Sequence, residues 1–563
     1  MKRRTSRLLL FLALSALQCQ DPNADLRIAN APLFDNLGTF HHPISTNSAL
    51  AQRYFDQAMV FYYGFNYAEA IRSFRAGARL DPDCAMFYWG EAQALGPHVN
   101  EPLTSKAASD AFFAIQKALK LAPQASAIER EYIDALSRRY SLGQKLSRAE
   151  LDIDFAQAML RLARNHPEDP DAATLFAESV MVLSPWNYWQ PNGQPRPNTL
   201  KILEALQAVL SKVPDHPGAN HYYIHAVEAA QPARAQQSAR ALETAAPGAG
   251  HLVHMPSHIY LLLGQYEKAA ASNRHAAMAD QAYIAACKKQ GFLPAGSTAK
   301  SLAACGNHSY YTQTYYPHDL HFLWYVQCMQ GNSAGALETA QKFIDAIPAS
   351  AFLKYPTLEM FLPIKLFTLA RFQKWAQILE ETRPAHELSY TNAMWHYTRG
   401  LAFAYTDHPD SANLQLRRLM AAATPNRTTA ALYGGAPSVQ LVSLAEADLQ
   451  GHLATVQKQF KLATRYFQNA VSLQDGLPFS EPPAWYYPVR QSLAKSYLAQ
   501  NKPKMAEEQY RQDLAKYPEN GWSLFGLQQA LRAQQKLTEA ADVERRFSAA
   551  WRNADVALPN NYW

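Results

Sequence analysis

Apolar positions recur every three or four residues along most of the chain, which is the period of an amphipathic α-helix. Residues 51–82 show the pattern well: one helical stretch runs to a break near Gly64–Asn66, and a second stops after Asp81 and Pro82. Alternating apolar and polar residues between hairpin turns, the pattern of β-strands, are absent. The pattern predicts an all-α fold of paired helices.

Small and aromatic residues recur within these pairs at fixed spacing. Alanine and glycine let two helices approach closely, aromatics fill the gap between pairs, and proline ends the second helix. The spacing is seen in two sets, Tyr67, Ala70, Phe74 and Pro82, and Leu493, Ala494, Tyr497, Ala506, Tyr510 and Pro518. Over residues 45–550 the chain therefore resembles tetratricopeptide-repeat (TPR) proteins, which implies a superhelical solenoid of stacked antiparallel helix pairs.

Three further segments resemble a type of bacterial TPR protein that has no established activity. They read HPGANHYYIHAVEAA (216–230), PGAGHLVHMPSHIYLLLGQYEKA (247–269) and YYPHDLHFLW (315–324). This resemblance implies a fold and leaves the reaction open.

The N-terminus has the features of an export signal. Residues 1–19 read MKRRTSRLLLFLALSALQC, a basic head before the apolar run Leu8–Leu17, which suits a signal peptide and is too short to span a membrane. Cys19 resembles the lipidation cysteine of bacterial lipoproteins, although Gln18 stands where that pattern has a small residue. Two interpretations remain, a lipoprotein tethered to the outer membrane or a cleaved protein that is periplasmic or secreted.

The rest of the chain divides into one long repeat region with flanking segments. We expect an N-terminal linker, then the solenoid, then a C-terminal tail, at 20–44, 45–550 and 551–563. Proline- and asparagine-rich or irregular stretches interrupt the repeat, and they predict insertion loops at 184–200, 287–317 and 474–488.

Composition and net charge limit the classes of partner that we expect the chain to bind. The chain of 563 residues is 48% hydrophobic, which excludes intrinsic disorder. Its net charge is +6, but residues 1–19 hold four basic and no acidic residues, and the remainder has 49 Lys and Arg against 47 Asp and Glu. A near-neutral body does not favour nucleic acid. We expect a protein or peptide in the concave groove, and membrane contact only through a lipid anchor.

Export places the cysteines in an oxidising compartment. Cys287 and Cys305 flank an irregular stretch and are candidates for a disulfide around it; buried free thiols are the equal alternative. No C-x-x-C pair occurs, so a thiolate zinc cluster is not expected.

Histidine is the most informative residue type. Ten of the 18 histidines lie between residues 216 and 321, and seven of these fall in three short segments with internal spacings of three or four. Such spacings put side chains on one face of a helix. The seven are His221, His225, His251, His254, His258, His318 and His321.

The spacing between the segments is close to whole repeats. His221 and His254 are 33 residues apart, as are His225 and His258, while His251 and His318 are 67 apart, as are His254 and His321. A repeat of about 34 residues brings such positions together in neighbouring pairs. We therefore expect a histidine-lined patch on the concave face.

Converging imidazoles and a carboxylate are how proteins hold Zn²⁺, Fe²⁺, Mn²⁺ or Cu²⁺. Glu228, three residues after His225, is the candidate carboxylate as ligand or base, with Asp319 and Glu178 as weaker ones. Pro256 either bends a helix or marks its first turn. The alternative to a metal site is a hydrogen-bonded polar seam, because the region is rich in tyrosine.

Three hypotheses for function remain. The first is an exported binding scaffold with a metal-holding patch, and the second is a metal-dependent hydrolase or oxidoreductase that uses the patch. The third is a periplasmic glycan- or peptide-binding protein, suggested by aromatic clusters. No H-E-x-x-H, G-x-S-x-G or Walker A motif is present, so no catalytic residue is assigned.

Overall fold

A computed structural model describes residues 30–100, 102–143, 146–289, 308–347, 356–422 and 437–558. Within these ranges the regular elements are all helices, no β-strand occurs, and an isolated bridge joins Trp189 and Pro195. The helices are α2 (Ala49–Tyr63), α3 (Tyr67–Leu80), α4 (Ala85–Ala94), α5 (Ser105–Leu121), η1 (Ala122–Gln124), α6 (Ala127–Ser137), α7 (Arg148–Asn165), α8 (Pro170–Val182), α9 (Pro197–Lys212), α10 (Pro217–Val227), η2 (Pro232–Ala235), α11 (Gln236–Ala245), α12 (Gly250–His254), α13 (Pro256–Leu262), α14 (Tyr266–Lys289), α15 (His308–Met329), α16 (Ser333–Ala346), η4 (Pro356–Phe361), α18 (Ile364–Arg371), α19 (Trp375–Glu380), α20 (Ser389–Tyr405), α21 (Pro409–Ala422), α22 (Ser438–Val456), α23 (Phe460–Asp475), α24 (Arg490–Leu498), α25 (Pro503–Lys516), α26 (Gly521–Ala533) and α27 (Leu537–Ala550).

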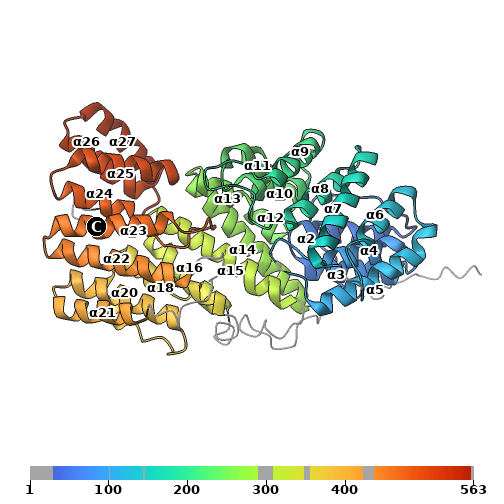
Figure 1. Cartoon of the computed structure of the whole chain (residues 1–563), viewed down its shortest axis with the longest axis horizontal. Helices are drawn as coiled ribbons and strands as arrows, with labels where there is room; N and C mark the ends of the chain where they lie inside the picture. The colour runs from blue at the N-terminus through green and yellow to red at the C-terminus, as the bar shows by residue number, and fades with distance from the viewer. Residues whose placement is uncertain are drawn as a thin grey trace, which may run out of the picture.

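Consecutive helices pack as pairs, and each pair packs on the next. The tightest pairs include α2 with α3, α20 with α21, α22 with α23 and α26 with α27. Figure 1 shows α20–α27 layered at one end and α2–α13 at the other, with α14, α15 and α16 between them. The predicted all-α, TPR-like solenoid is confirmed.

The turn inside a pair has a common backbone shape. In eight described pairs the residue two positions before the second helix has a positive φ. Seven of these residues are glycine or polar, which tolerate that conformation or sit at the surface. They are Gly264, Gly331, Gln373, Asp407, Lys458, Asn501 and Gln535. The eighth is Phe65, with φ 58° and only 2% of its surface exposed.

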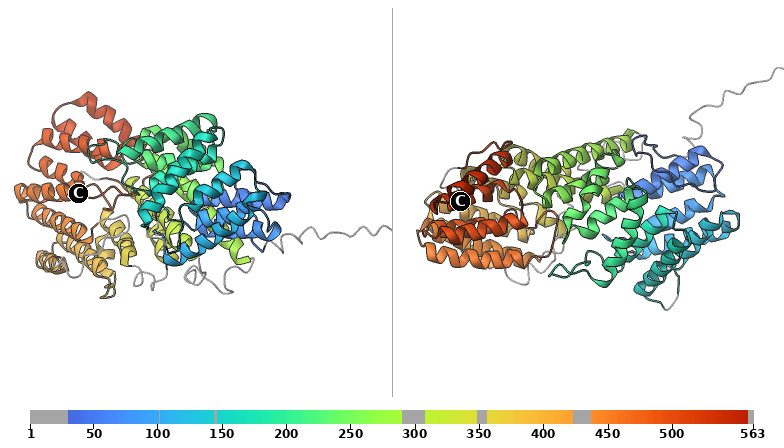
Figure 2. Two further views of the ribbon diagram at one scale, coloured as in Figure 1. Left: turned by 45° about the vertical axis from the view of Figure 1, so that its right-hand side comes forward. Right: turned by 90° about the horizontal axis from the view of Figure 1, so that it is seen from above.

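The C-terminal repeats fold back onto the middle of the chain. The Trp522 indole donates to the Cys328 carbonyl at 2.9 Å, and the Tyr266 hydroxyl donates to the Pro518 carbonyl at 2.9 Å. Asp555 accepts the backbone N–H groups of Ser333 and Ala334, both at 2.7 Å, and so caps α16. Figure 2 shows the molecule from two further sides, with the orange and red C-terminal helices next to the green and yellow middle of the chain.

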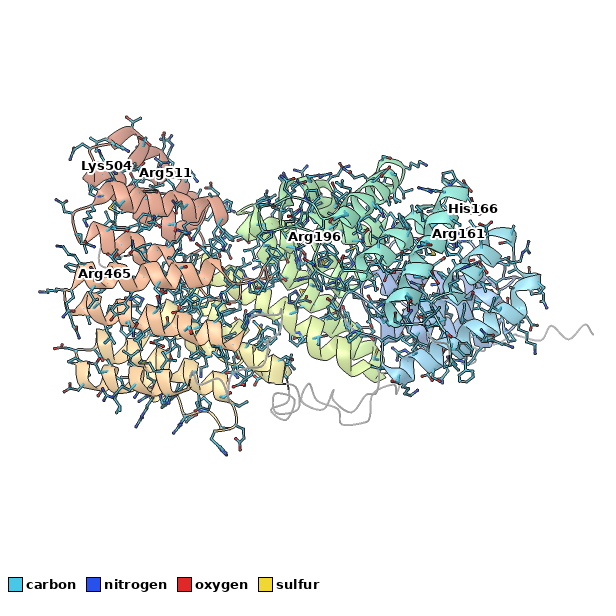
Figure 3. The ribbon with its side chains drawn as sticks, viewed as in Figure 1. Arg161, His166, Arg196, Arg465, Lys504 and Arg511 are labelled. Atoms are coloured by element: carbon cyan, nitrogen blue, oxygen red, sulfur yellow. The ribbon has the colours of Figure 1, made fainter. Side chains whose placement is uncertain are left out.

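The surface of the outer helices is charged. Arg465 on α23 and Lys504 and Arg511 on α25 are exposed and project outward (Figure 3). In the described ranges, none of the helices has the length and apolar character that a membrane-spanning segment needs. Residues 1–19, with Cys19, lie outside the described residues, so the signal peptide and lipidation remain predictions.

All three predicted loops overlap a helix, and for 474–488 the overlap is short, because α23 ends at Asp475. Pro197 starts α9, so the irregular part of 184–200 stops at Arg196. Within 287–317, α14 reaches Lys289 and α15 begins at His308, and residues 290–307 lie outside the described ranges. Pro317 sits inside α15 immediately before the first histidine of that segment.

Candidate metal centre

Six imidazoles meet where four helices come together: His221 and His225 from α10, His251 and His254 from α12, His258 from α13 and His318 from α15. We call these six residues the histidine cluster. Ring centroids join them in a chain, with 4.8 Å from His221 to His225 and 4.7 Å from His254 to His318. Figure 1 shows α10, α12, α13 and α15 in the middle of the molecule, and α12 contacts both α13 and α15.

The cluster is an interior site. Exposed fractions are between 0% and 5% for five of its members, and His318 is half-buried. The sequence predicted a patch on the concave face; the structure instead encloses these side chains, because α10 also packs against α2. The turn after α2 thereby covers the side of the cluster nearest His221.

Pro256 interrupts the helix that carries three of the histidines. It occupies the first turn of α13, after α12 ends at His254, so it both breaks the helix and starts the next one. The break leaves the spacings of three and four intact, and His251, His254 and His258 still face one way.

Glu228 ties two of the imidazoles together. Its Oε1 accepts the Nδ1–H of His225 at 2.9 Å, and its Oε2 accepts the Nδ1–H of His258 at 2.7 Å. Burial raises the pKa of Glu228, but His258 and His225 outweigh burial and hold this pKa at about 2. Glu228 is therefore a carboxylate that positions both rings, as carboxylates commonly do behind metal-binding histidines.

His254 and His258 meet edge to edge. Their Nε2 atoms are 2.9 Å apart. The Nδ1–H of His254 donates to Asn273 Oδ1 at 2.6 Å, because the Asn273 amide nitrogen is used on the Ala269 carbonyl at 2.8 Å. With both Nδ1 atoms acting as donors, the two facing Nε2 atoms both carry lone pairs when both rings are neutral, and they share an N–H···N hydrogen bond when one ring is protonated.

The ligand-type atoms fall into two trios, each within 4.8 Å. His254, His258 and His318 form the first trio, and His221, His225 and His251 form the second. His225, Glu228 and His258 also satisfy this distance, but their atoms are joined by the hydrogen bonds described above. The site therefore consists of two trios that are linked through the Glu228 carboxylate.

Burial disfavours the charged form of five of the six rings. Burial, and after it the neighbouring imidazoles, lower the pKa values of His221, His251, His254 and His318 well below 6.5. Burial also lowers the pKa of His225. Neutral imidazole is the form that binds a metal ion.

Aromatic rings surround the cluster. Phe65 lies 4.4 Å from His221 and 5.2 Å from His251, centroid to centroid, and Phe322 lies 5.1 Å from His254. Trp186, 48% exposed, covers His225 at 4.9 Å, so the 184–196 segment borders the site. Such a shell keeps water away from the imidazoles.

His321, which the spacing placed in the same patch, lies outside the cluster. Its ring packs against Trp324 at 5.3 Å and Phe361 at 4.8 Å. Burial lowers its pKa to about 3. Residues three apart on a helix differ by about 60° in direction, so His318 faces α12 and α13 while His321 faces the aromatic residues of the next repeat.

The two weaker acidic candidates behave differently. Asp319 is fully buried, with its Oδ1 3.2 Å from His254 Nδ1, so it belongs to the surroundings of the cluster. Glu178 instead lies beside Gln93, 3.5 Å from its amide nitrogen, and burial raises its pKa to about 7. Glu178 is not part of the centre.

One positioning residue and one neighbouring acid were not predicted. Asn273 orients His254 from α14, nineteen residues later, the same separation as between His396 and Gln415 in a later pair. That recurring separation is a signal present in the sequence. Glu481, in the predicted 474–488 loop, has a pKa raised well above its usual range by burial and then by Glu228, a long-range proximity that no local pattern indicates.

Of the two cysteines predicted to form a disulfide, the structure describes one. Cys287 is buried, and Arg72 Nη2 donates to its Sγ at 3.2 Å. Cys305 lies outside the described residues. The disulfide between them stays a prediction.

Comparison with known proteins gives likenesses of architecture at low identity. No family model matches the chain, and no curated protein matches it. The chain is similar to the human IFIT1 dimer with m7Gppp-AAAA, at 12% identity and TM-score 0.30, over 94% of each chain. It is similar to yeast Tom70, at 12% identity and TM-score 0.27, over 89% of this chain and 90% of that one. It is also similar to the APC/C hetero-tetramer Cut9-Hcn1, at 13% identity and TM-score 0.27, over 89% and 88%.

Proposed function

We propose that this chain is a protein-binding helical scaffold that holds a divalent transition-metal ion at His254, His258 and His318. One observation carries the proposal, the approach of His254 Nε2 to His258 Nε2 at 2.9 Å with both Nδ1–H groups already donating elsewhere. In neutral rings these two Nε2 lone pairs face each other and repel, and an ion that accepts both removes the repulsion. A tetrahedral zinc ion sets its nitrogen ligands about 3.4 Å apart, so the two Nε2 atoms would separate by about 0.5 Å to bind one ion.

The surroundings support the same ion. Glu228 and Asn273 hold the outer nitrogens of His258 and His254, which fixes the tautomer and orientation of each ligand. The nitrogens of His318 lie close enough to complete the trio. Neutral imidazoles favour Zn²⁺, Fe²⁺ or Cu²⁺ over Ca²⁺ or Mg²⁺, which prefer oxygen ligands.

The scaffold part of the proposal rests on the architecture. Stacked helix pairs present extended surfaces that bind protein or peptide partners. We place the protein outside the cytoplasm, in the periplasm or tethered to the outer membrane, on the signal-like residues 1–19. Cell fractionation of the full chain with and without the Cys19→Ser change tests the location and the lipid anchor separately.

Zinc titration of the purified protein tests the metal site. After removal of metals with a chelator, we expect wild-type protein to bind zinc tightly at this trio, measured by competition with a chromophoric chelator and by elemental analysis. His318→Gln should lose this ion. His321→Gln is the matched control, because it changes a buried imidazole three residues away on the same helix and should keep the ion.

Two results would overturn the site. One is a chelator-treated wild-type protein that takes up no zinc; the other is equal zinc binding by His318→Gln and His321→Gln. Thermal unfolding in chelator shows whether each variant is folded, so a loss of binding is not mistaken for a loss of structure.

A second candidate function follows from the ligand number. Three imidazoles leave one coordination position of a tetrahedral ion for water, as in catalytic zinc sites and unlike closed structural ones. This favours metal-assisted hydrolysis as the alternative. Azide added to the cobalt-substituted protein should change the visible spectrum if that position is open, and a spectrum that azide leaves unchanged argues against a catalytic role.

A further inference from the structure

The second trio has its own ligand geometry. We infer that His221, His225 and His251 bind a second divalent transition-metal ion. Their ligand-type nitrogens lie within 4.8 Å of one another. Ring centroids are 4.8 Å from His221 to His225, 4.9 Å from His221 to His251 and 6.3 Å from His225 to His251, so His221 lies between the other two rings.

Hydrogen bonds turn one nitrogen of each α10 ring toward the trio. His221 Nδ1 donates to the Tyr63 carbonyl at 2.5 Å, and His225 Nδ1 donates to Glu228 Oε1 at 2.9 Å. The Nε2 atoms of both rings are therefore unprotonated and carry lone pairs. Both are buried and have no hydrogen-bond partner among the described residues.

His251 completes the set. It is 3% exposed, and within the described part of the chain neither of its ring nitrogens has a hydrogen-bond partner. Its position is fixed through the backbone, whose N–H donates to the Tyr311 hydroxyl at 3.1 Å. Buried polar atoms of this kind are rarely left unpaired in proteins, and three of them converging on one point indicate a ligand that accepts lone pairs.

Phe65 gives this site a dry wall. Its ring is parallel to that of His225, with an angle of 1° between the planes, and it also contacts His221 and His251. Its backbone has φ 58° at a turn position that is glycine or polar in the seven other pairs described above. A large apolar side chain at this position is thus specific to the turn that faces the trio.

The second site stands apart from the proposed one. The two trios share no ligand, and they are connected through Glu228, whose two oxygens hold one ring of each. The second ion would bind in addition to the ion of the proposed function, and it does not require that first ion. The carboxylate also supplies negative charge between the two cations.

Cadmium binding and ¹¹³Cd NMR count the ions. We expect two bound cadmium ions and two resonances from wild-type protein. His251→Gln should remove one resonance and His318→Gln the other, each leaving one ion. His321→Gln should keep both, and circular dichroism in chelator establishes that every variant is folded.

The outcomes separate the two sites. If wild-type protein binds one ion that His318→Gln removes and His251→Gln retains, the second site is wrong and the proposed function stands. If the single ion depends on His251 and not on His318, the proposed site is wrong and this one stands. One ion lost in both variants means a single shared centre and overturns the inference of two ions; no bound ion overturns both proposals.

Discussion

Two groups of buried histidines in this protein use their nitrogens in opposite ways. In the first group, which we call the Asp171 network, Asp171 accepts from His42 Nδ1 at 2.7 Å, from Tyr63 Oη at 2.5 Å and from His216 Nε2 at 3.1 Å. His216 Nδ1 in turn accepts the Ala219 N–H at 3.1 Å. The second trio of the histidine cluster differs. Four of its ring nitrogens have no hydrogen-bond partner among the described residues.

The difference shows what separates a structural histidine from a ligand. Burial lowers the pKa of His42, but Asp171 outweighs burial and raises it to about 9, so this pair is ionic. The cluster has six rings around one positioning carboxylate, and burial lowers the pKa values of His221, His251 and His254 well below 6.5. Ligand-type atoms of His42, Asp169 and Asp171 also lie within 4.8 Å of one another, yet protein donors already use the Asp171 oxygens. Unused lone pairs, and not proximity alone, mark the candidate metal site.

The largest expected effect comes from breaking the Asp171 network. Asp171→Asn removes the charge that holds His42 and His216, and loss of one partner from a buried ion pair costs about 3–5 kcal/mol. We expect urea unfolding at neutral pH to show that loss. Metal content should stay at the wild-type value, because Asp171 contacts no member of the histidine cluster through the hydrogen bonds described.

The control for this prediction is Glu178→Gln, which changes another buried acid outside both groups. A metal content that falls in Asp171→Asn, in protein still folded by circular dichroism, would remove the distinction between the two groups. So would an unfolding free energy equal to that of the wild type.

The pH dependence of stability gives a somewhat smaller effect. The pKa of His42 is about 9 in the folded protein and about 6.5 when unfolded, so the folded state binds more protons between these values. The free energy of unfolding should therefore fall as pH rises from 6.5 to 9, by about 2–3 kcal/mol. Urea unfolding at pH 6.5, 7.5 and 9, with chelator present, measures it.

The matched variant is His42→Gln, which keeps a hydrogen-bond donor without the charge. Its free energy of unfolding should lose this part of the pH dependence. His321→Gln should keep the wild-type slope, since burial holds the pKa of His321 at about 3, below this range. An unchanged slope in His42→Gln would show that other groups carry the pH dependence.

Much of the fold could be predicted because TPR-like pairs are built from local patterns. The helical period, the break near Gly64–Asn66 and the small residues between helices all act over a few residues. The packing of the C-terminal repeats on the middle of the chain could not be predicted in this way. It depends on contacts such as Trp522 to Cys328, which are 194 positions apart.

The site was predicted where it follows the repeat. Spacings of 33 and 67 residues indicated that α10, α12, α13 and α15 bring histidines together, and six of the seven named residues do meet. The prediction for His321 was wrong because spacing alone does not say which neighbour each side of a helix faces. The turn at Phe65 buries the histidine cluster only because α2 packs against α10, and no local sequence pattern predicts that contact.

The smallest expected effect tests how the two trios are connected. Glu228→Gln leaves one carbonyl oxygen, so the side chain accepts from His225 or His258 but not from both, and its amide group faces the other N–H. We expect metal affinity to fall about 10–100-fold, the usual cost of losing a carboxylate behind a ligating histidine, which is about 1.4–2.7 kcal/mol. Competition titration with a chromophoric chelator measures the change, and Glu178→Gln, the same substitution at a buried acid away from the cluster, should bind metal like the wild type. Affinity equal to wild type in Glu228→Gln would mean that the carboxylate only fills space between the rings, and the histidine cluster would then differ from the Asp171 network in its imidazoles alone.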